Sequence, residues 1–302
     1  MSDHPTRVKI LTPAKVNLGL RVLGKRPDGF HEIETLFVAV SLFDELTLER
    51  RDKGGLSMTW EKGRADLAPG DLTVGAANLV TRAVREFERG TGSKLDIAIH
   101  LKKSIPIAAG LGGGSSDAAA ALKGLCILYP RLAEQTNLST YAERLGSDIP
   151  FFLGSPSAIG RGRGEVLSPR AIDLSWYAIV ICPRVASPTP EVYAALDLTC
   201  LPKMSDFPVR LEGDGFFAAL ALFHNDLQDV VERRIPEVLH WKNWLLTLGA
   251  EGAYVSGSGP SVFGVFRHKP ESGWIEVIKA EDVDAFIVRP LDTQMTMVIG
   301  LS

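Results

Sequence analysis

Cysteines are scarce in this sequence and are not clustered. The chain has three of them, Cys126, Cys182 and Cys200, and no two are spaced as CxxC. An odd, scattered set argues against a disulfide framework and against a structural zinc site, and it is typical of a reducing compartment. Because the first nine residues also lack the apolar segment of a secretory signal, we expect a cytoplasmic protein.

Long apolar segments and an excess of charge of one sign are missing too. No apolar stretch reaches the ~18 residues of a membrane-spanning helix, and the stretch 118–129 is interrupted by Lys123. With 33 basic and 36 acidic residues the formal net charge is −3, which gives no general affinity for polyanions. We therefore expect neither a membrane nor nucleic acid as a partner, whereas local binding of one phosphate-bearing small molecule remains compatible with the composition.

Strand and helix patterns are mixed along the 302 residues, a length that favours two domains. Alternating apolar positions predict antiparallel strands between 7 and 50 with a turn at 25–29, and 51–72 is predicted to be a loop with a short strand near 58–60. Periodicity predicts a helix over 78–87 and a strand over 95–101, and further helices are expected over 139–145, 190–196, 226–233 and 236–248 and strands over 176–182 and 262–266. Without strict alternation of strand and helix, the predicted fold class is α+β.

A glycine loop joins an apolar strand to an alanine-rich helix near the middle of the chain. Gly112, Gly113 and Gly114 let a ligand approach the main chain closely, and the helix that follows offers unpaired N–H groups to an anion. Ser115 and Ser116 are predicted at the N-cap, where their hydroxyls could donate to phosphate or bind Mg²⁺. The alternative is a flexible turn with a routine serine cap. The loop is neither a P-loop nor a clean dinucleotide fingerprint, because no Lys-Ser/Thr pair closes it and Ser115 takes the third glycine position.

Several polar residues elsewhere are ambiguous when taken alone. Asp148 precedes an apolar run and is compatible with an N-cap or turn aspartate, while Lys15 is compatible with a solvated strand-edge lysine. Arg161 and Arg163 could approach phosphate, but a solvated basic loop is the commoner arrangement. The six histidines show no zinc-ligand spacing and predict no metal cluster.

Three ordered motifs carry a family resemblance. Pro13-Ala-Lys-Val-Asn-Leu, the segment 105–120 and Ser256-Gly-Ser-Gly-Pro-Ser-Val-Phe resemble the three motifs of the GHMP kinase superfamily. Four further pieces resemble the branch of that superfamily whose alcohol acceptor carries a cytidine diphosphate group: Asp28-Gly-Phe-His, Ser147-Asp-Ile-Pro-Phe-Phe, Pro188-Thr-Pro-Glu-Val-Tyr and Asn225-Asp-Leu. Together they span most of the chain.

The resemblance implies a two-domain GHMP kinase fold that uses ATP and Mg²⁺ to phosphorylate a small-molecule hydroxyl. A ribosomal-protein-S5-like nucleotide-binding domain would cover 1–166 and a ferredoxin-like domain 167–302, with the site in the cleft between them. Asp148 would accept the hydroxyl proton, and Lys15 would keep that carboxylate ionised. The ATP-binding residues implied are Pro106, Ala108, Ala109, Gly110, Leu111, Gly112, Gly113, Gly114, Ser115 and Ser116. The Mg²⁺ ligands are not assigned, and we expect a monomer or a weak homodimer.

The resemblance also implies an acceptor pocket. Asn17 would hydrogen-bond the polyol, Phe30 and Tyr193 would sandwich the cytosine ring, and His31 would bond to its edge. Pro190 would shape the same pocket, and Gly257, Ser258 and Gly259 would lie near the phosphates and the acceptor. Two residues depart from the family pattern: Phe30 stands where tyrosine is usual, and Ala108 replaces a common glycine, a change we expect to be tolerated.

Three other functions remain open at this point. A sister kinase acting on mevalonate, homoserine or a sugar would keep Lys15, Asp148 and the glycine loops but would not need the base-stacking residues. A catalytically inactive nucleotide-binding regulator would have lost the acid or the lysine, and both are present. A purely structural protein would leave the glycine loop without a purpose.

Overall fold

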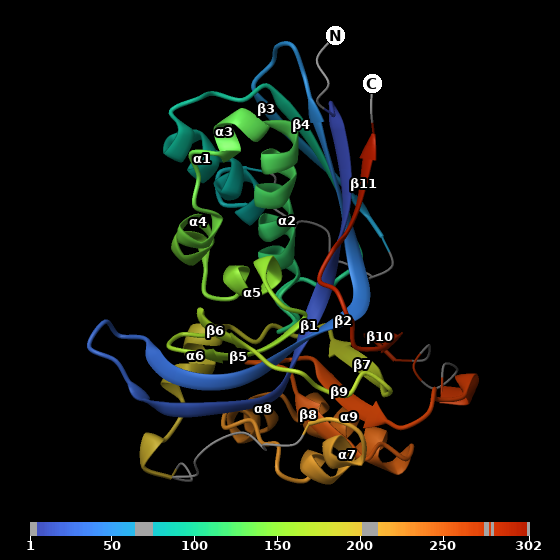
Figure 1. Ribbon diagram of the computed structural model, residues 1–302. Coiled ribbons are helices and arrows are strands. Elements are labelled where there is room, and N and C mark those ends of the chain that lie inside the picture. Colours follow the sequence, from blue (N-terminus) through green and yellow to red (C-terminus); the bar gives the residue numbers. More distant parts are fainter. Residues whose placement is uncertain (1–4, 64–74, 201–210, 275–277, 279–280, 301–302) are drawn as a thin grey trace.

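The computed structural model describes residues 5–63, 75–200, 211–274, 278 and 281–300, and shows two packed halves, each built on one sheet (Figure 1). The first half carries a seven-stranded sheet with its helices on one face, and the second a four-stranded sheet with its own helical layer. The predicted α+β class is confirmed. In the part of the chain described, no helix is long and apolar enough to cross a membrane.

The first sheet is dominated by two long antiparallel strands. Its strands are β1 (Arg7–Lys25), β2 (His31–Arg50), β3 (Leu56–Lys62), β4 (Ile97–Lys103), β5 (Ser157–Arg161), β6 (Val166–Pro169) and β11 (Thr296–Gly300). The order is β11-β1-β2-β4-β3, with β5 paired to β2 and β6 to β5. Only the β3–β4 pairing is parallel among these strands. The hairpin end of β1 and β2 extends beyond the helix-covered part of the first sheet and lies beside the second half of the molecule (Figure 1).

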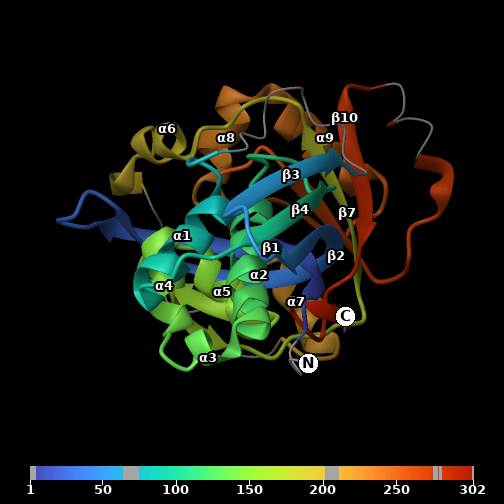
Figure 2. The ribbon, with the colours of Figure 1, turned by 90° about the horizontal axis from the view of Figure 1, so that it is seen from above.

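Five helices cover one face of this sheet (Figures 1 and 2). They are α1 (Leu79–Thr91), α2 (Gly113–Leu128), α3 (Pro130–Ala133), α4 (Leu138–Leu145) and α5 (Ile149–Leu153). Helix α2 lies closest to the strands because its alanines at 118–121 are fully buried and take little space. A Cβ at Gly124 would come within 2.8 Å of Leu48, so this position also needs a small residue.

The second sheet is antiparallel in the order β10-β7-β9-β8. Its strands are β7 (Tyr177–Pro183), β8 (Gly252–Val255), β9 (Val262–Phe266) and β10 (Val283–Val288). The accompanying helices are α6 (Thr189–Ala194), α7 (Asp214–Leu220), α8 (Gln228–Arg234) and α9 (Pro236–Thr247), with short 3₁₀ turns at Leu198–Cys200 and Ser272–Trp274. Helix α9 packs on β8 and β9 through Val238, Trp241 and Leu245, which are buried at the spacing of one helix face.

Most predicted elements are present with shifted ends. Helix α1 extends four residues beyond the predicted 78–87, and β4 covers 97–103 in place of 95–101. The loop predicted over 51–72 contains β3, and its residues from 64 onward lie outside the described part. Strand β11, near the end of the chain, pairs with β1 in the first sheet. The boundary between 166 and 167 stays a prediction.

Backbone hydrogen bonds join β1 to the second half of the molecule. The Leu20 N–H donates to the His224 carbonyl over 2.9 Å, and the Asp226 N–H donates to the Leu20 carbonyl over 2.9 Å. The Val22 N–H donates to the Asp226 carboxylate over 2.7 Å. The two halves are therefore fixed to each other along the strand that carries Lys15 and Asn17.

Candidate active site

A cavity of about 640 Å³ opens between the two halves. It is lined by residues from the β1–β2 hairpin, both glycine loops, the residues before α5 and the segment leading into α6. Of the sequence-predicted site residues it contains Lys15, Asn17, Phe30, His31, Ala108, Gly110, Gly112, Asp148, Pro190, Tyr193, Gly257 and Ser258. Gly259 does not line it, because that residue faces Val231 and Val255. Folding thus brings together residues that lie up to 243 positions apart, from Lys15 to Ser258.

Lys15 is held by a set of polar contacts that point its ammonium group into the cavity. Its Nζ donates to Asn17 Oδ1 over 2.5 Å and to the Gly110 carbonyl over 2.8 Å. Asn17 Nδ2 in turn donates to Thr35 Oγ1 over 2.7 Å, so the amide is oriented on both sides. Burial lowers the pKa of Lys15, and the negative charge of Asp148 partly offsets that effect. Asn17 therefore positions Lys15, a contact that the sequence did not predict.

Asp148 lies at the N-cap of α5, which is the position expected if it were only a capping residue. Its side chain, however, makes no capping hydrogen bond. Its Oδ2 lies 3.9 Å from Lys15 Nζ, beyond hydrogen-bonding distance. The Asp148 side chain is 36% exposed, whereas that of Lys15 is 4% exposed. The carboxylate is thus electrostatically paired and still open to a ligand's hydroxyl group.

A second cavity of about 280 Å³ lies on the other side of the first glycine loop. Its lining includes Pro106, Ala108, Ala109, Gly110, Gly112, Gly113, Gly114 and Ser115 from the predicted ATP-binding set. Ala108, Gly110 and Gly112 belong to both cavities, so the glycine loop is their common wall. Leu111 and Ser116 do not reach the lining and are buried in the core below it.

The serine N-cap predicted for α2 is wrong. The N-cap is Gly112, with a left-handed φ of 70°, and α2 begins at Gly113. Ser116 already donates its N–H to the Gly112 carbonyl over 2.9 Å and lies inside the helix. A glycine with a positive φ starts the helix without a side-chain cap, so the free N–H groups of its first turn face the cavity. The sequence signal for this helix start was the glycine run itself, because glycine readily adopts a positive φ.

The departure at Ala108 has a structural consequence. Ala108 has a φ of 53°, and among the residues described no other non-glycine has a positive φ. An L-residue there is strained by roughly 1–2 kcal/mol, which explains why glycine is the usual choice. The strained residue lies on the wall between the two cavities.

A buried charge cluster beneath α2 was not predicted. Lys103 Nζ donates to Asp117 over 2.8 Å and also contacts Asp44. Asp44 accepts hydrogen bonds from the N–H groups of Ser104 and Ile105, and Asp117 accepts one from the Thr12 hydroxyl. Burial works against the charge of Lys103, but the two carboxylates raise its pKa overall. The cluster fixes the strand end and the start of α2 on either side of the glycine loop.

The second glycine loop is held in place by side chains from three directions. Asn225 Nδ2 donates to the carbonyls of Val255 and Gly257 over 2.9 and 2.8 Å. The Ser187 hydroxyl donates to the Ser258 carbonyl over 2.7 Å. Ser256 Oγ donates over 3.0 Å to the Gly110 carbonyl, which also accepts from Lys15. The Asn225-Asp-Leu motif therefore orients the loop.

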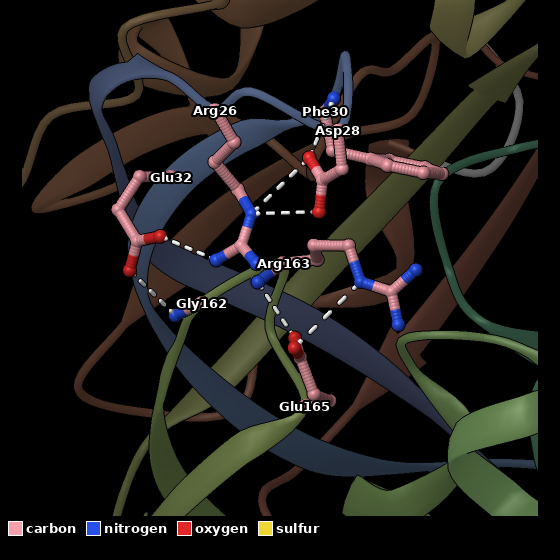
Figure 3. A network of polar contacts seen from close by, with 7 residues as sticks. All are labelled: Arg26, Asp28, Phe30, Glu32, Gly162, Arg163 and Glu165. Atoms are coloured by element: carbon pink, nitrogen blue, oxygen red, sulfur yellow. Dashed lines mark hydrogen bonds and ion pairs between the residues drawn. The ribbon is translucent and has the colours of Figure 1, made fainter.

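Aromatic rings gather at the far end of the larger cavity. The His31 ring stacks on that of Tyr193, with centroids 4.9 Å apart and planes 29° apart. Burial raises the pKa of Tyr193, so its phenol stays protonated. Burial and then Lys25 lower the pKa of His31, which favours the neutral imidazole. Phe30 is half exposed, and the Arg163 guanidinium lies over its ring (Figure 3).

Comparison with known proteins identifies the family. Residues 78–155 match the GHMP kinases N terminal domain, and 212–273 match the GHMP kinases C terminal domain. The chain is 36% identical over 261 residues to 4-diphosphocytidyl-2-C-methyl-D-erythritol kinase of Shouchella clausii, covering 86% of each chain. It is 40% identical over 262 residues to the enzyme of that name from Pelotomaculum thermopropionicum, covering 85% of this chain and 88% of the relative. The chain belongs to the 4-diphosphocytidyl-2-C-methyl-D-erythritol kinase family of the GHMP kinases.

Solved structures agree with this family assignment. A crystal structure of 4-(cytidine 5'-diphospho)-2C-methyl-D-erythritol kinase superposes with a TM-score of 0.76 at 35% identity, covering 93% of this chain and 98% of that chain. Homoserine kinase from Cytophaga hutchinsonii superposes with a TM-score of 0.69 at 19% identity, covering 99% of both chains, a likeness in fold alone. The resemblance seen in the sequence motifs is confirmed.

Proposed function

We propose that this member of the kinase family transfers the γ-phosphoryl group of ATP to the 2-hydroxyl of 4-diphosphocytidyl-2-C-methyl-D-erythritol. The products are ADP and the 2-phosphate, a step in the non-mevalonate route to isoprenoid precursors. The observation that carries the proposal is the wall shared by the two cavities, with Lys15 and Asp148 beside it. ATP in the smaller cavity and the acceptor in the larger one meet at that wall.

The reacting groups have separate roles in this proposal. Asp148 accepts the proton of the attacking hydroxyl, a bond forms between that oxygen and the γ-phosphorus, and the bond from phosphorus to the ADP oxygen breaks. Lys15 stabilises the ionised carboxylate and the charge that develops on the attacking oxygen. The N–H groups at the start of α2 bind the phosphates. Catalysis then consists mainly of positioning and electrostatic stabilisation.

Mg²⁺ is the metal ion proposed for this reaction, and when bound it would neutralise part of the phosphate charge. The described residues hold no group of three or more His, Cys, Asp or Glu side chains with metal-binding geometry. This fits an ion held mostly by phosphate oxygens and water with one or two protein oxygens, as Mg²⁺ usually is. The Ser115 hydroxyl of the smaller cavity and the Asp148 carboxylate of the larger one are two of the lining side-chain oxygens that would hold it.

The aromatic end of the larger cavity supports a cytosine base in the acceptor. Phe30 and Tyr193 offer ring faces, and a neutral His31 offers one donor and one acceptor to the polar edge of the base. Pro190, Gly257 and Ser258 complete the pocket, with Gly259 behind them as part of the loop. We further propose that the enzyme works in the cytoplasm as a monomer or weak homodimer.

A coupled assay of ADP release tests the function directly. The purified protein is expected to turn over the cytidyl acceptor in the presence of Mg²⁺ and to ignore mevalonate, homoserine and galactose. Turnover with one of those three alcohols and none with the cytidyl acceptor would replace the proposal with a sister kinase. Absence of turnover with all four would favour a nucleotide-binding regulator.

Asp148→Asn tests the role of the carboxylate. This isosteric change removes the proton acceptor, and we expect kcat to fall by about 10²–10⁴-fold, in line with the loss of a general base. Thermal unfolding and nucleotide binding are the controls and are expected to stay close to those of the wild type. A variant that is folded and retains more than a tenth of the wild-type kcat would contradict the role.

A further inference from the structure

Two arginines that the sequence left undecided lie at the end of β5 and in the turn to β6, and the structure separates them. Arg161 pairs with the buried carboxylate of Glu34 over 2.7 Å and is thereby used in the scaffold. Arg163 instead lines the larger cavity, and its guanidinium lies 4.9 Å from the centre of the Phe30 ring. Although the two arginines are only two residues apart, Arg161 contacts the scaffold and Arg163 lines the cavity.

The position of Arg163 is fixed by a network that joins this turn to the tip of the β1–β2 hairpin (Figure 3). The Ile33 N–H donates to the Gly162 carbonyl over 2.7 Å, and the Gly162 N–H donates to Glu32 over 3.1 Å. Glu32 also accepts from Arg26 over 2.7 Å. The turn and the hairpin tip that presents Phe30 therefore hold each other, so that Arg163 and Phe30 form one unit of the cavity wall.

The guanidinium of Arg163 keeps donors for a ligand. Its Nε lies 3.6 Å from Glu165, and within the described chain its two Nη groups have no hydrogen-bond partner. Figure 3 shows these two nitrogens pointing away from Glu165. The Arg163 side chain is 30% exposed, so the group is neither buried nor fully solvated. A planar fork of N–H donors matches phosphate oxygens bidentately.

The charges along the cavity favour an anion at this end. Lys15, Lys25 and Arg163 are its cationic lining residues, and Asp148 is its only carboxylate among the described lining. Lys15 and Asp148 pair with each other at the reacting end, and the cations near the aromatic rings are Lys25 and Arg163. Glu165 and Asp28 lie beside Arg163 outside the lining and balance part of its charge. A ligand whose base rests on those rings carries its first phosphates one ribose away.

We propose that Arg163 binds the diphosphate of the acceptor and so makes the site selective for a nucleoside diphosphate over the bare nucleoside. The proposal rests on the proposed function and adds a specificity-determining residue to it. The guanidinium packs against Phe30 with one face and directs its Nη groups at the phosphate oxygens. The positive residue in the turn thus couples recognition of the base to recognition of the phosphates.

Competitive inhibition by cytidine and by cytidine diphosphate tests this directly, with Arg163→Met as the variant because methionine keeps the apolar cover over Phe30. We expect the inhibition constant of cytidine diphosphate to rise about tenfold, the value of one charge-assisted hydrogen bond, and that of cytidine to stay within about twofold. The KM of the acceptor is expected to rise by a similar factor, with kcat and the KM of ATP unchanged. Arg163→Lys should recover part of the loss.

Arg161→Met is the matched control, since it removes the same charge two residues earlier in the chain, from a side chain that faces Glu34. It is expected to leave the ratio of the two inhibition constants unchanged. If Arg163→Met weakens cytidine and cytidine diphosphate equally, or weakens neither, the proposal is overturned while the function stands. A wild-type enzyme that does not turn over the cytidyl acceptor would overturn both.

Discussion

Ala108 is the residue where local backbone strain and the active site coincide. Replacing it by glycine removes a strain of roughly 1–2 kcal/mol from the folded protein. It also raises the entropy of the unfolded chain, which costs about 0.4–1 kcal/mol of stability. We therefore expect Ala108→Gly to raise the free energy of unfolding by about 0.5–1 kcal/mol, as measured by urea denaturation. Ala109→Gly is the control, because Ala109 is buried without a positive φ, and it should lower that free energy. Equal effects of both changes would contradict the strain argument.

His31 gives the site a pH dependence with a definite sign. Burial, followed by the charge of Lys25, lowers its pKa in the folded protein below the ordinary value of 6.5. The unfolded chain therefore binds more protons between the two pKa values, so the contribution to stability is complete above pH 6.5 and is lost as the pH falls through the folded pKa.

The measurement is the free energy of unfolding of the wild type and of His31→Asn at two pH values, about 7.5 and about 5.5. These values lie about one pH unit above and below the pKa of an unperturbed histidine. We expect the advantage of the wild type to shrink at the lower pH. An advantage that stays constant or grows would show that His31 does not titrate as inferred.

The first glycine loop works as an element, because its three glycines are not equivalent. At Gly112 the φ is positive, and an added Cβ would lie 3.0 Å from both the Lys15 side chain and the Phe152 ring. At Gly114 the nearest atom to an added Cβ is 3.5 Å away, in Leu79, and the backbone is helical. Geometry therefore requires glycine at position 112, whereas position 114 tolerates a side chain.

This difference makes a matched pair of variants. Gly112→Ala is expected to lower the free energy of unfolding by about 2 kcal/mol, from left-handed strain and contact with Lys15. Gly114→Ala should leave it unchanged or raise it by up to about 0.5–1 kcal/mol, since alanine favours the helix. Both are measured by thermal unfolding without nucleotide, so that binding does not enter. A larger loss for Gly114→Ala would mean that the start of α2 is misplaced.

At the scale of the whole molecule, one apolar core crosses between the two halves. Val16 and Leu36 from the first sheet belong to the same buried cluster as Val180 and Phe263 from the second. Polar contacts accompany this core along β1, where Leu20 bonds to the segment that contains Asn225. The walls of the two cavities therefore belong to one packed body. Such a body can hold two substrates in line for the reaction.

Asn225 is the residue through which this arrangement can be tested. Its side chain is buried and satisfies three backbone groups, the carbonyls of Val255 and Gly257 and the N–H of Leu227. Asn225→Ala leaves them unpaired, and we expect unfolding to become about 3 kcal/mol easier and the KM of the acceptor to rise as Gly257 loosens. The control is His224→Gln, at a half-exposed neighbour, with an expected change within about 0.5 kcal/mol. A loss of stability at unchanged KM would separate the loop from the acceptor site.

How much could be predicted follows from the range of the interactions involved. The long strands of the hairpin follow a local period of two and were predicted, as were the alanine-rich helix after the glycine run and the helix α9. The start of α2 was misplaced, because serine is a common cap and the glycine alternative depends on a single positive φ. Strand β11 was missed, since its pairing with β1 lies almost the whole chain away.

The sequence by itself determined the family and the residue types at the site, because Lys15, Asp148 and both glycine runs stand in ordered motifs that can be read without a fold. Only the tertiary structure decided how those residues are used. Contacts across 95 positions give Lys15 the Gly110 carbonyl, and contacts across 59 bury Lys103 on Asp44. The same packing sends Arg161 to Glu34 and Arg163 to Phe30. Such contacts depend on which chain segments meet in space, and no local pattern in the sequence records that.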